Sequence, residues 1–238
     1  MTDDGCADAH GVELAIRSAA ALVAASAALV DPGLGLLAAS ALPAVDTAAE
    51  IAGTAVRHRM AAVLGCAAGH VGDTADGFVR QISGDPHKIQ LLVDALRAGA
   101  ESVWEDRIRV LGRALANGAI AEDDALVDEE RKWVAILASI DAPDLRIMGY
   151  LMREDPERAG HMIIARREDL AKASGYRQLI GPALLAMERN GLILSERGAD
   201  QDKQTQYRWH LSESTVIYKR SGLTKACYQR FLDAGVDL

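Results

Sequence analysis

Three groups of side chains in this chain of 238 residues are of types that could do chemistry. His58, Cys66 and His70 are of the kinds that bind transition metals. Carboxylates gather between positions 122 and 130, as they do in calcium sites. Basic residues gather between positions 166 and 225, where 11 Lys and Arg outnumber 7 Asp and Glu, and such residues contact phosphate. The spacing within each group decides which chemistry is available.

The spacing does not favour a metal site. Cys66 and His70 are four residues apart and could share a helix face, but His58 lies about 80° further round a helix from Cys66, and no fourth ligand is evident. We interpret these residues as isolated histidines and a buried cysteine. The carboxylates lack the alternating ligands, central glycine and closing glutamate of a calcium loop. We interpret them as solvated charges favoured by the N-terminal dipole of the helix that contains Trp133; they are Glu122, Asp123, Asp124, Asp128, Glu129 and Glu130.

No catalytic signature is present in the sequence. GxSxG, HExxH and GxxxxGK[ST] do not occur, and no paired carboxylates stand on a recognisable scaffold. "GLGLLA", which begins at Gly33, matches a variant of the dinucleotide fingerprint. Pro32 precedes it and its flanks are rich in alanine, whereas the fingerprint requires a strand before the first glycine. We therefore predict a protein that is not an enzyme and that has no cofactor.

Composition and length predict a mainly helical protein with two domains. Half of the residues are hydrophobic, alanine is the most frequent of them, and only 4% of the residues are aromatic, which favours closely packed helices. Residues 1–140 hold 11 basic and 20 acidic residues, a net charge of −9, whereas residues 141–238 hold 15 and 14, a net charge of +1. We expect an Ala-rich helical domain over residues 1–140 and a second domain over residues 141–238.

The first domain is expected to contain a hairpin and a bundle. Residues 18–45 carry one charge, Asp31, and form two apolar arms of about 13 residues, each shorter than the roughly 20 that span a bilayer. We predict a buried helical hairpin there, with membrane contact as the alternative. Amphipathic helices follow from residue 85 to residue 140 and predict a bundle. Helix breaks or stops are expected at Gly65, Gly69, Gly72, Gly77 and Asn117-Gly118.

Cysteine usage and the start of the chain predict a cytoplasmic location. Cys6, Cys66 and Cys227 are odd in number and far apart, which disfavours a disulfide framework. The first residues, "MTDDGCADAH", are acidic where an export signal would be basic.

The second domain shows a recognisable order of elements. A helix over residues 145–152 precedes the short helix "REDLAKAS", a turn at Gly175 and a helix that ends "LLAMERNGLI". An apolar strand, a polar tip and a return strand with Tyr207, Trp209 and Leu211 on one face follow, and then a closing helix over residues 223–233. Over residues 144–235 this order resembles the winged helix-turn-helix domains of bacterial repressors. The closing helix would cover the core or pair with a second subunit.

The resemblance implies DNA binding through the helix around residue 185. Its core face is expected to be Ile180, Leu184 and Met187, which leaves an outer face where only Gln178 and Arg189 can read bases. Pro182 conflicts with a helix interior unless the helix begins there. We therefore expect mainly phosphate contacts. The nucleic-acid-binding candidates are Arg166, Arg167, Lys172, Arg177, Gln178, Arg189, Arg197, Lys203 and Arg208.

The outer face of this helix is otherwise apolar and suits a second use. Pro182 and Leu185 would be contact residues if the winged helix were a dimerisation or protein-docking module. The sequence as a whole predicts a non-enzymatic regulatory protein whose C-terminal domain binds double-stranded DNA. The N-terminal domain would serve assembly or sense a partner. A protein-interaction module and a membrane-associated effector that uses residues 18–45 are the alternatives.

Overall fold

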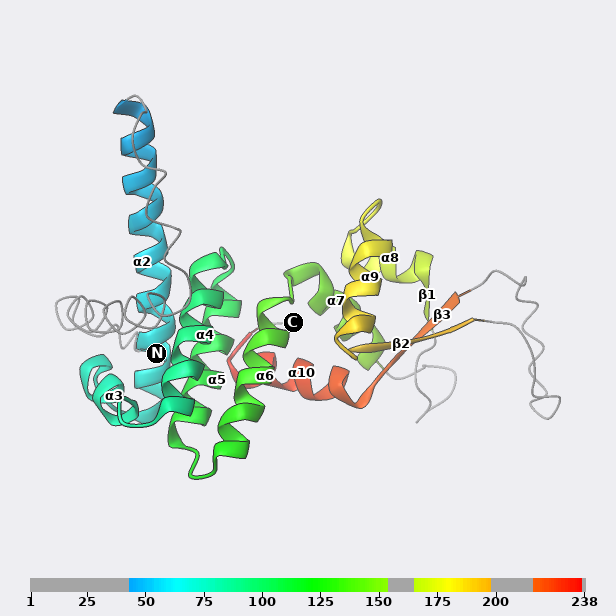
Figure 1. The fold of residues 1–238 in the computed structure, drawn as a ribbon. Coiled ribbons are helices and arrows are strands. Elements are labelled where there is room, and N and C mark those ends of the chain that lie inside the picture. Colours follow the sequence, from blue (N-terminus) through cyan, green and yellow to red (C-terminus); the bar gives the residue numbers. More distant parts are fainter. Residues whose placement is uncertain (1–42, 154–164, 198–215, 237–238) are drawn as a thin grey trace, which may run out of the picture. The chain divides into compact units, whose positions relative to one another are not determined.

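The computed structural model describes residues 43–153, 165–197 and 216–236, with side chains from residue 53 onward and excluding that of residue 197 (Figure 1). These residues form nine helices and a three-stranded antiparallel sheet, so the prediction of a mainly helical protein is confirmed. The chain divides into two compact units, Met1–Ser139 and Ile140–Leu238. The hairpin predicted for residues 18–45 lies almost entirely outside the described residues. In the described part, no helix is both long and apolar enough to cross a membrane.

Five helices make up the described part of the first unit. The longest, α2, packs against the next three, and α6 packs against α4 and α5. The buried side chains at these contacts are small or aliphatic, such as Val63, Leu64, Leu92 and Leu111. The helices are α2 (Pro43–Val71), α3 (Ala75–Ile82), α4 (Pro86–Glu101), α5 (Glu105–Ile120) and α6 (Asp124–Ala138).

Short polar side chains start three of these helices. The Thr74 hydroxyl accepts a hydrogen bond from the Gly77 amide at 3.1 Å, and Asp85 accepts from the His87 amide at 2.9 Å. Asp123 accepts from the Ala125 amide at 2.9 Å and begins α6. Such caps satisfy amides that have no acceptor within the helix. The acidic segment therefore lies largely inside the first turns of α6.

Most of the predicted glycine breaks are wrong. The α2 helix continues through Gly65 and Gly69 and ends at Gly72, whose φ of +78° favours glycine. Gly77 lies within α3. The α5 helix continues through Asn117-Gly118 to Ile120. Packing against neighbouring helices outweighs the roughly 1 kcal/mol by which glycine disfavours a helix interior.

Two glycines permit the close approach of α2 to α4 and α5. A Cβ atom at Gly112 would lie 2.8 Å from the Val63 carbonyl oxygen and 2.6 Å from Cys66 Cβ. A Cβ atom at Gly99 would overlap the Val63 side chain. The backbones of α2 and α5 therefore meet at a point that no larger residue fits without movement of a helix.

We predict that Gly112→Ala lowers the free energy of unfolding by about 1–3 kcal/mol, because the added methyl group meets backbone atoms that cannot rotate away. Gly65→Ala is the matched control, since no described atom lies within 4 Å of its Cβ position. The control should raise stability by about 0.5–1 kcal/mol through helix propensity. Urea denaturation followed by circular dichroism measures both. Equal effects of the two substitutions would contradict the close contact.

The second unit combines four helices with the sheet. The strand order is β1-β3-β2, so the last strand lies between the other two, with Ser195 of β2 opposite Tyr218 of β3. The predicted return strand around Tyr207 lies outside the described residues, and the strand that pairs with β2 comes later in the chain. The elements are α7 (Ala142–Met152), β1 (Ala165–Arg166), α8 (Arg167–Ser174), α9 (Ile180–Arg189), β2 (Ile193–Arg197), β3 (Val216–Arg220) and α10 (Gly222–Asp233).

The core of the second unit lies among α7, α8, α9, β2 and α10. Ile180, Leu184 and Met187 are buried, as the sequence predicted for the inner face of α9. Cys227 and Phe231 of α10 are also buried. Burial raises the pKa of the Cys227 thiol to about 12. This thiol is therefore protonated at neutral pH and behaves as a small apolar side chain.

Candidate nucleic-acid interface

The turn before α9 is fixed to α7 by one guanidinium group. Arg146 Nη2 and Nε donate hydrogen bonds to the Ser174 carbonyl oxygen at 2.8 and 3.2 Å. The buried Ser174 hydroxyl donates to the Leu170 carbonyl oxygen at 2.8 Å and accepts from the Tyr176 amide at 3.1 Å. Gly175 follows with a φ of +80° and ends α8. The polar groups of the turn are thereby satisfied where the chain reverses.

The other end of α9 is fixed to α10. Gly191 has a φ of +69° and ends the turn after the helix. The Ser221 hydroxyl donates to the Gly191 carbonyl oxygen at 2.6 Å, and the buried Thr224 hydroxyl donates to the Leu192 carbonyl oxygen. Both Ser221 and Thr224 also form the capping box that begins α10. The segments that precede and follow α9 are therefore each hydrogen-bonded to another helix.

Pro182 causes no break, because α9 begins at Ile180 and Pro182 lies in its first turn. Amides in that turn have no acceptor within the helix, so the missing donor costs no helical hydrogen bond. Gly181 permits a close approach at the same place. A Cβ atom there would lie 3.0 Å from Arg167 Nη2, so the guanidinium of Arg167 lies over the first turn of α9.

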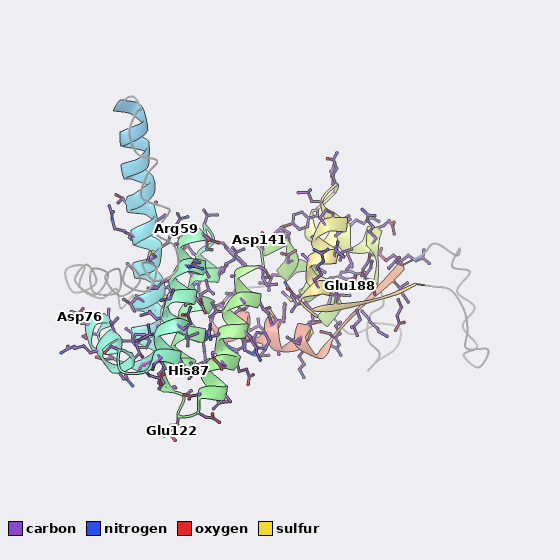
Figure 2. The ribbon with its side chains drawn as sticks, in the orientation of Figure 1. Arg59, Asp76, His87, Glu122, Asp141 and Glu188 are labelled. Atoms are coloured by element: carbon purple, nitrogen blue, oxygen red, sulfur yellow. The ribbon has the colours of Figure 1, made fainter. Side chains whose placement is uncertain are left out.

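The outer face of α9 is largely as the sequence predicted. Pro182, Leu185, Ala186 and Arg189 are exposed, while Gly181 is half-buried. The sequence reasoning missed Glu188, which is also exposed and accepts a hydrogen bond from the Ser195 hydroxyl of β2. Figure 2 shows Glu188 on this helix beside the sheet. A carboxylate on this face opposes the approach of phosphate.

The structure brings together some of the nucleic-acid-binding candidates. Arg177 and Gln178 are exposed in the turn immediately before α9, close along the chain to the first turn that Arg167 covers. Arg166 and Arg189 are exposed at the start of α8 and the end of α9. Lys172 instead lines a pocket with α7 and α10. The Arg197 side chain, Lys203 and Arg208 lie outside the described residues.

The electrostatic balance around the interface is modest. Residues 165–196 hold five basic and four acidic side chains. Lys219 of β3 forms an ion pair with Glu196 of β2, which offsets its charge. Burial raises the pKa of Tyr218 above its usual value of 10, so its phenol is neutral near pH 7. The arrangement favours a few phosphate contacts over a continuous basic surface.

The acidic cluster of the first unit has a structural role. Arg131 donates to Asp94 of α4 at 3.1 Å and to Asp128 of α6 at 3.3 Å. His87 Nδ1 lies 3.4 Å from Asp128, and this contact and Arg131 lower the pKa of that carboxyl. Figure 2 shows His87 and Glu122 at the same end of the bundle. Within the described residues, no three His, Cys, Asp or Glu side chains are grouped so that they could hold a metal ion.

Comparisons of the chain with protein-family profiles, with characterised proteins and with solved structures gave no match. We therefore infer its function from the chemistry and geometry of its own residues.

We predict that Arg146→Met lowers the free energy of unfolding by about 1–3 kcal/mol, because the Ser174 carbonyl then loses two charged donors. Arg153→Met, at the residue that follows the same helix, is the control. Its guanidinium lies 5.8 Å from the centre of the Tyr150 ring and contributes less. Thermal unfolding at equal pH and salt compares the two variants. If both lose the same stability, the hydrogen bonds to Ser174 do not hold the turn.

Proposed function

We propose that the second unit is a winged helix that binds duplex DNA, with α9 in the major groove and mainly phosphate contacts. The observation that carries this proposal is the order helix, strand, helix, turn, helix, strand, strand, together with a sheet in which β3 lies between β1 and β2. This order agrees with the resemblance to bacterial repressor domains and adds the short strand β1. In such folds the helix that follows the turn lies in the major groove.

The exposure and support of α9 favour this role. Its inner face is buried, its outer face meets solvent, and the segments before and after it are hydrogen-bonded to α7 and to the start of α10. A helix with this support can enter a groove about 12 Å wide without losing its own packing. The N-terminal turn of α9 also carries the partial positive charge of the helix dipole, and Arg167 adds a full charge there.

Contacts to phosphate explain this surface better than base reading does. Gln178 and Arg189 are the exposed candidates with donors suited to base edges, whereas Pro182, Leu185 and Ala186 offer none. The basic residues around the turn supply charge that positions the unit without specifying sequence. We therefore propose a cytoplasmic, non-enzymatic regulatory protein, with the first unit serving assembly or partner sensing.

We predict that the full chain is retained on mixed genomic duplex fragments at low salt and is released as salt rises. Arg177→Ala combined with Arg189→Ala should weaken retention and reduce the slope against log salt by about 2, since each phosphate contact contributes about 1. Arg80→Ala combined with Lys132→Ala removes the same charge from exposed positions of the first unit and is the control. Mobility shift across a salt series measures all three proteins.

Two outcomes would contradict DNA binding by this unit. The first is an absence of retention even at the lowest salt concentration. The second is an equal loss of retention in the interface variant and the control variant, because net charge alone would then explain it.

Exposed apolar side chains favour a second candidate function, association through the same face. Leu179, Leu185 and Leu194 are 63%, 48% and 46% exposed, and they lie just before α9, within it and in β2. Large exposed apolar side chains are enriched in interaction surfaces. The partner we propose for this function is a second copy of the chain.

We predict that Leu185→Asp reduces self-association if this face is an interface, because a carboxylate would be buried without a partner. Leu126→Asp is the control, since Leu126 is 51% exposed in α6 of the first unit. Light scattering over a range of protein concentrations gives the mass of each variant. An unchanged mass in the Leu185 variant rules out this interface, and retained duplex binding by that variant would favour the DNA function.

A further inference from the structure

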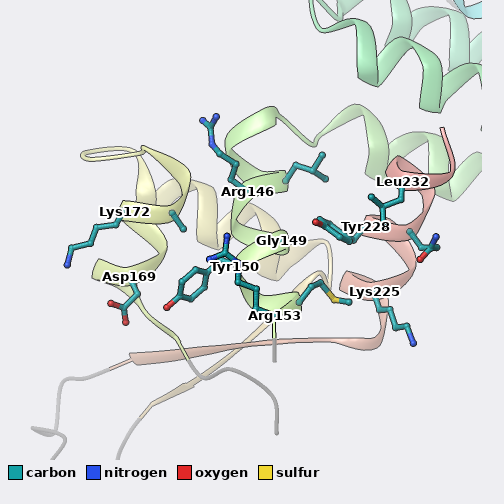
Figure 3. A pocket seen from close by; sticks show the side chains of 13 residues that line it. Arg146, Gly149, Tyr150, Arg153, Asp169, Lys172, Lys225, Tyr228 and Leu232 are labelled. Atoms are coloured by element: carbon teal, nitrogen blue, oxygen red, sulfur yellow. The ribbon is translucent and has the colours of Figure 1, made fainter. Parts of the chain in front are cut away.

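A pocket with a volume of about 770 Å³ lies in the second unit among α7, α8 and α10 (Figure 3). The α7 helix lies between α8 and α10, and residues of all three helices line the pocket. This volume is within the range of about 300–1,000 Å³ that is typical of small-molecule sites. The pocket is built from residues of one compact unit and is separate from the outer face of α9.

Gly149 allows the Tyr228 ring to approach the backbone of α7 inside the pocket. A Cβ atom there would lie 3.2 Å from the Tyr228 hydroxyl oxygen and 3.4 Å from its Cε2 atom. The Tyr228 ring therefore lies close to bare backbone, and among the described residues its hydroxyl has no hydrogen-bond partner. Tyr150 adds a second ring on α7. Two aromatic rings and an available hydroxyl suit a ligand that contains a ring.

The charges that line the pocket are nearly all positive. Arg146, Arg153, Lys172 and Lys225 contribute four cations, whereas Asp169 contributes the one carboxylate. An oxygen of Asp169 already accepts a hydrogen bond from the Arg166 amide at 3.2 Å. Within the described ranges, none of the four cations pairs with a carboxylate. An anion is the occupant that this imbalance favours, because each cation repels the others.

The pocket contrasts with the rest of an acidic chain. The net charge of the protein is −8, and Arg131 and Lys219 each form ion pairs with carboxylates. The chain contains 34 Asp and Glu residues, but only one of them, Asp169, lines the pocket with the four cations. Lys172 and Lys225 come from different helices, α8 and α10, and the fold places them on opposite sides of one pocket.

We propose that this pocket binds a small organic anion that contains a planar ring and a phosphate, carboxylate or sulfonate group. The ring lies over Gly149 between Tyr150 and Tyr228, and Lys172 on the α8 side and Lys225 on the α10 side attract the anionic group from opposite edges of the pocket (Figure 3). Lys172 is five residues beyond Arg167, about 140° round α8 from the side that faces α9. The proposal therefore reassigns Lys172 from DNA to the pocket, and it does not depend on DNA binding.

Two dyes with the same rings test the proposal on the full chain. The anionic probe is 8-anilinonaphthalene-1-sulfonate, and the neutral probe is N-phenyl-1-naphthylamine. We expect the anionic probe to bind at one saturable site. Lys172→Gln combined with Lys225→Gln should weaken that binding about tenfold, or 1.4 kcal/mol, while leaving the affinity for the neutral probe unchanged. Arg80→Gln combined with Lys132→Gln is the control, because it removes two exposed charges from the first unit.

The outcomes separate this site from the alternatives. Equal affinity for the anionic probe in the pocket variant and the control variant would overturn the proposal, as would the absence of a saturable site. Loss of duplex binding by the pocket variant with no change in probe binding would also overturn it and would assign these lysines to DNA. Both lysines are exposed, so the variants should unfold at the temperature of the unaltered protein, which circular dichroism checks.

Discussion

The contact between the Arg146 guanidinium and the Ser174 carbonyl is the interaction on which both surfaces proposed for the second unit depend. A carbonyl group at the C-terminal end of a helix finds no amide donor within that helix. If it were buried without another donor, the protein would lose stability. Arg146 supplies two donors from α7 and thereby ties the end of α8, where the turn toward α9 starts, to α7. The same side chain lines the pocket on the other side of the turn. Occupation of the pocket and placement of α9 therefore share one residue.

The first unit depends on a different constraint, the close approach of backbones. Gly99 and Gly112 lie where α4 and α5 meet Val63 of α2, and the absence of side chains there permits contact between the helices. An Ala-rich composition is suited to such packing, because small side chains at the contact allow the helix backbones to approach closely. Polar contacts then join the ends of the bundle. Arg131 connects α4 with α6, and Lys88 donates to the Ala119 carbonyl oxygen at 2.8 Å at the end of α5.

Charge distribution distinguishes the two surfaces of the second unit. On the α9 side, Glu188 and Glu196 lie among the basic residues, so the local excess of positive charge is small. In the pocket, four cations share one carboxylate that already caps α8. A surface of the first kind suits weak contacts with an extended polyanion, which depend on salt. A site of the second kind suits a compact anion held by several donors.

Local sequence determined the elements that depend on neighbouring residues. The helix starts at Asp85 and Asp141, the inner face of α9 and the left-handed turns at Gly175 and Gly191 follow from short-range hydrogen bonding, periodicity and the conformational freedom of glycine. Only the tertiary structure decided that α5 continues through Gly118, that β3 lies between β1 and β2, and that Lys172 and Lys225 line one pocket. These features join residues that are distant in the sequence. Their free energy comes from packing and charge between elements, which no local pattern of residue types records.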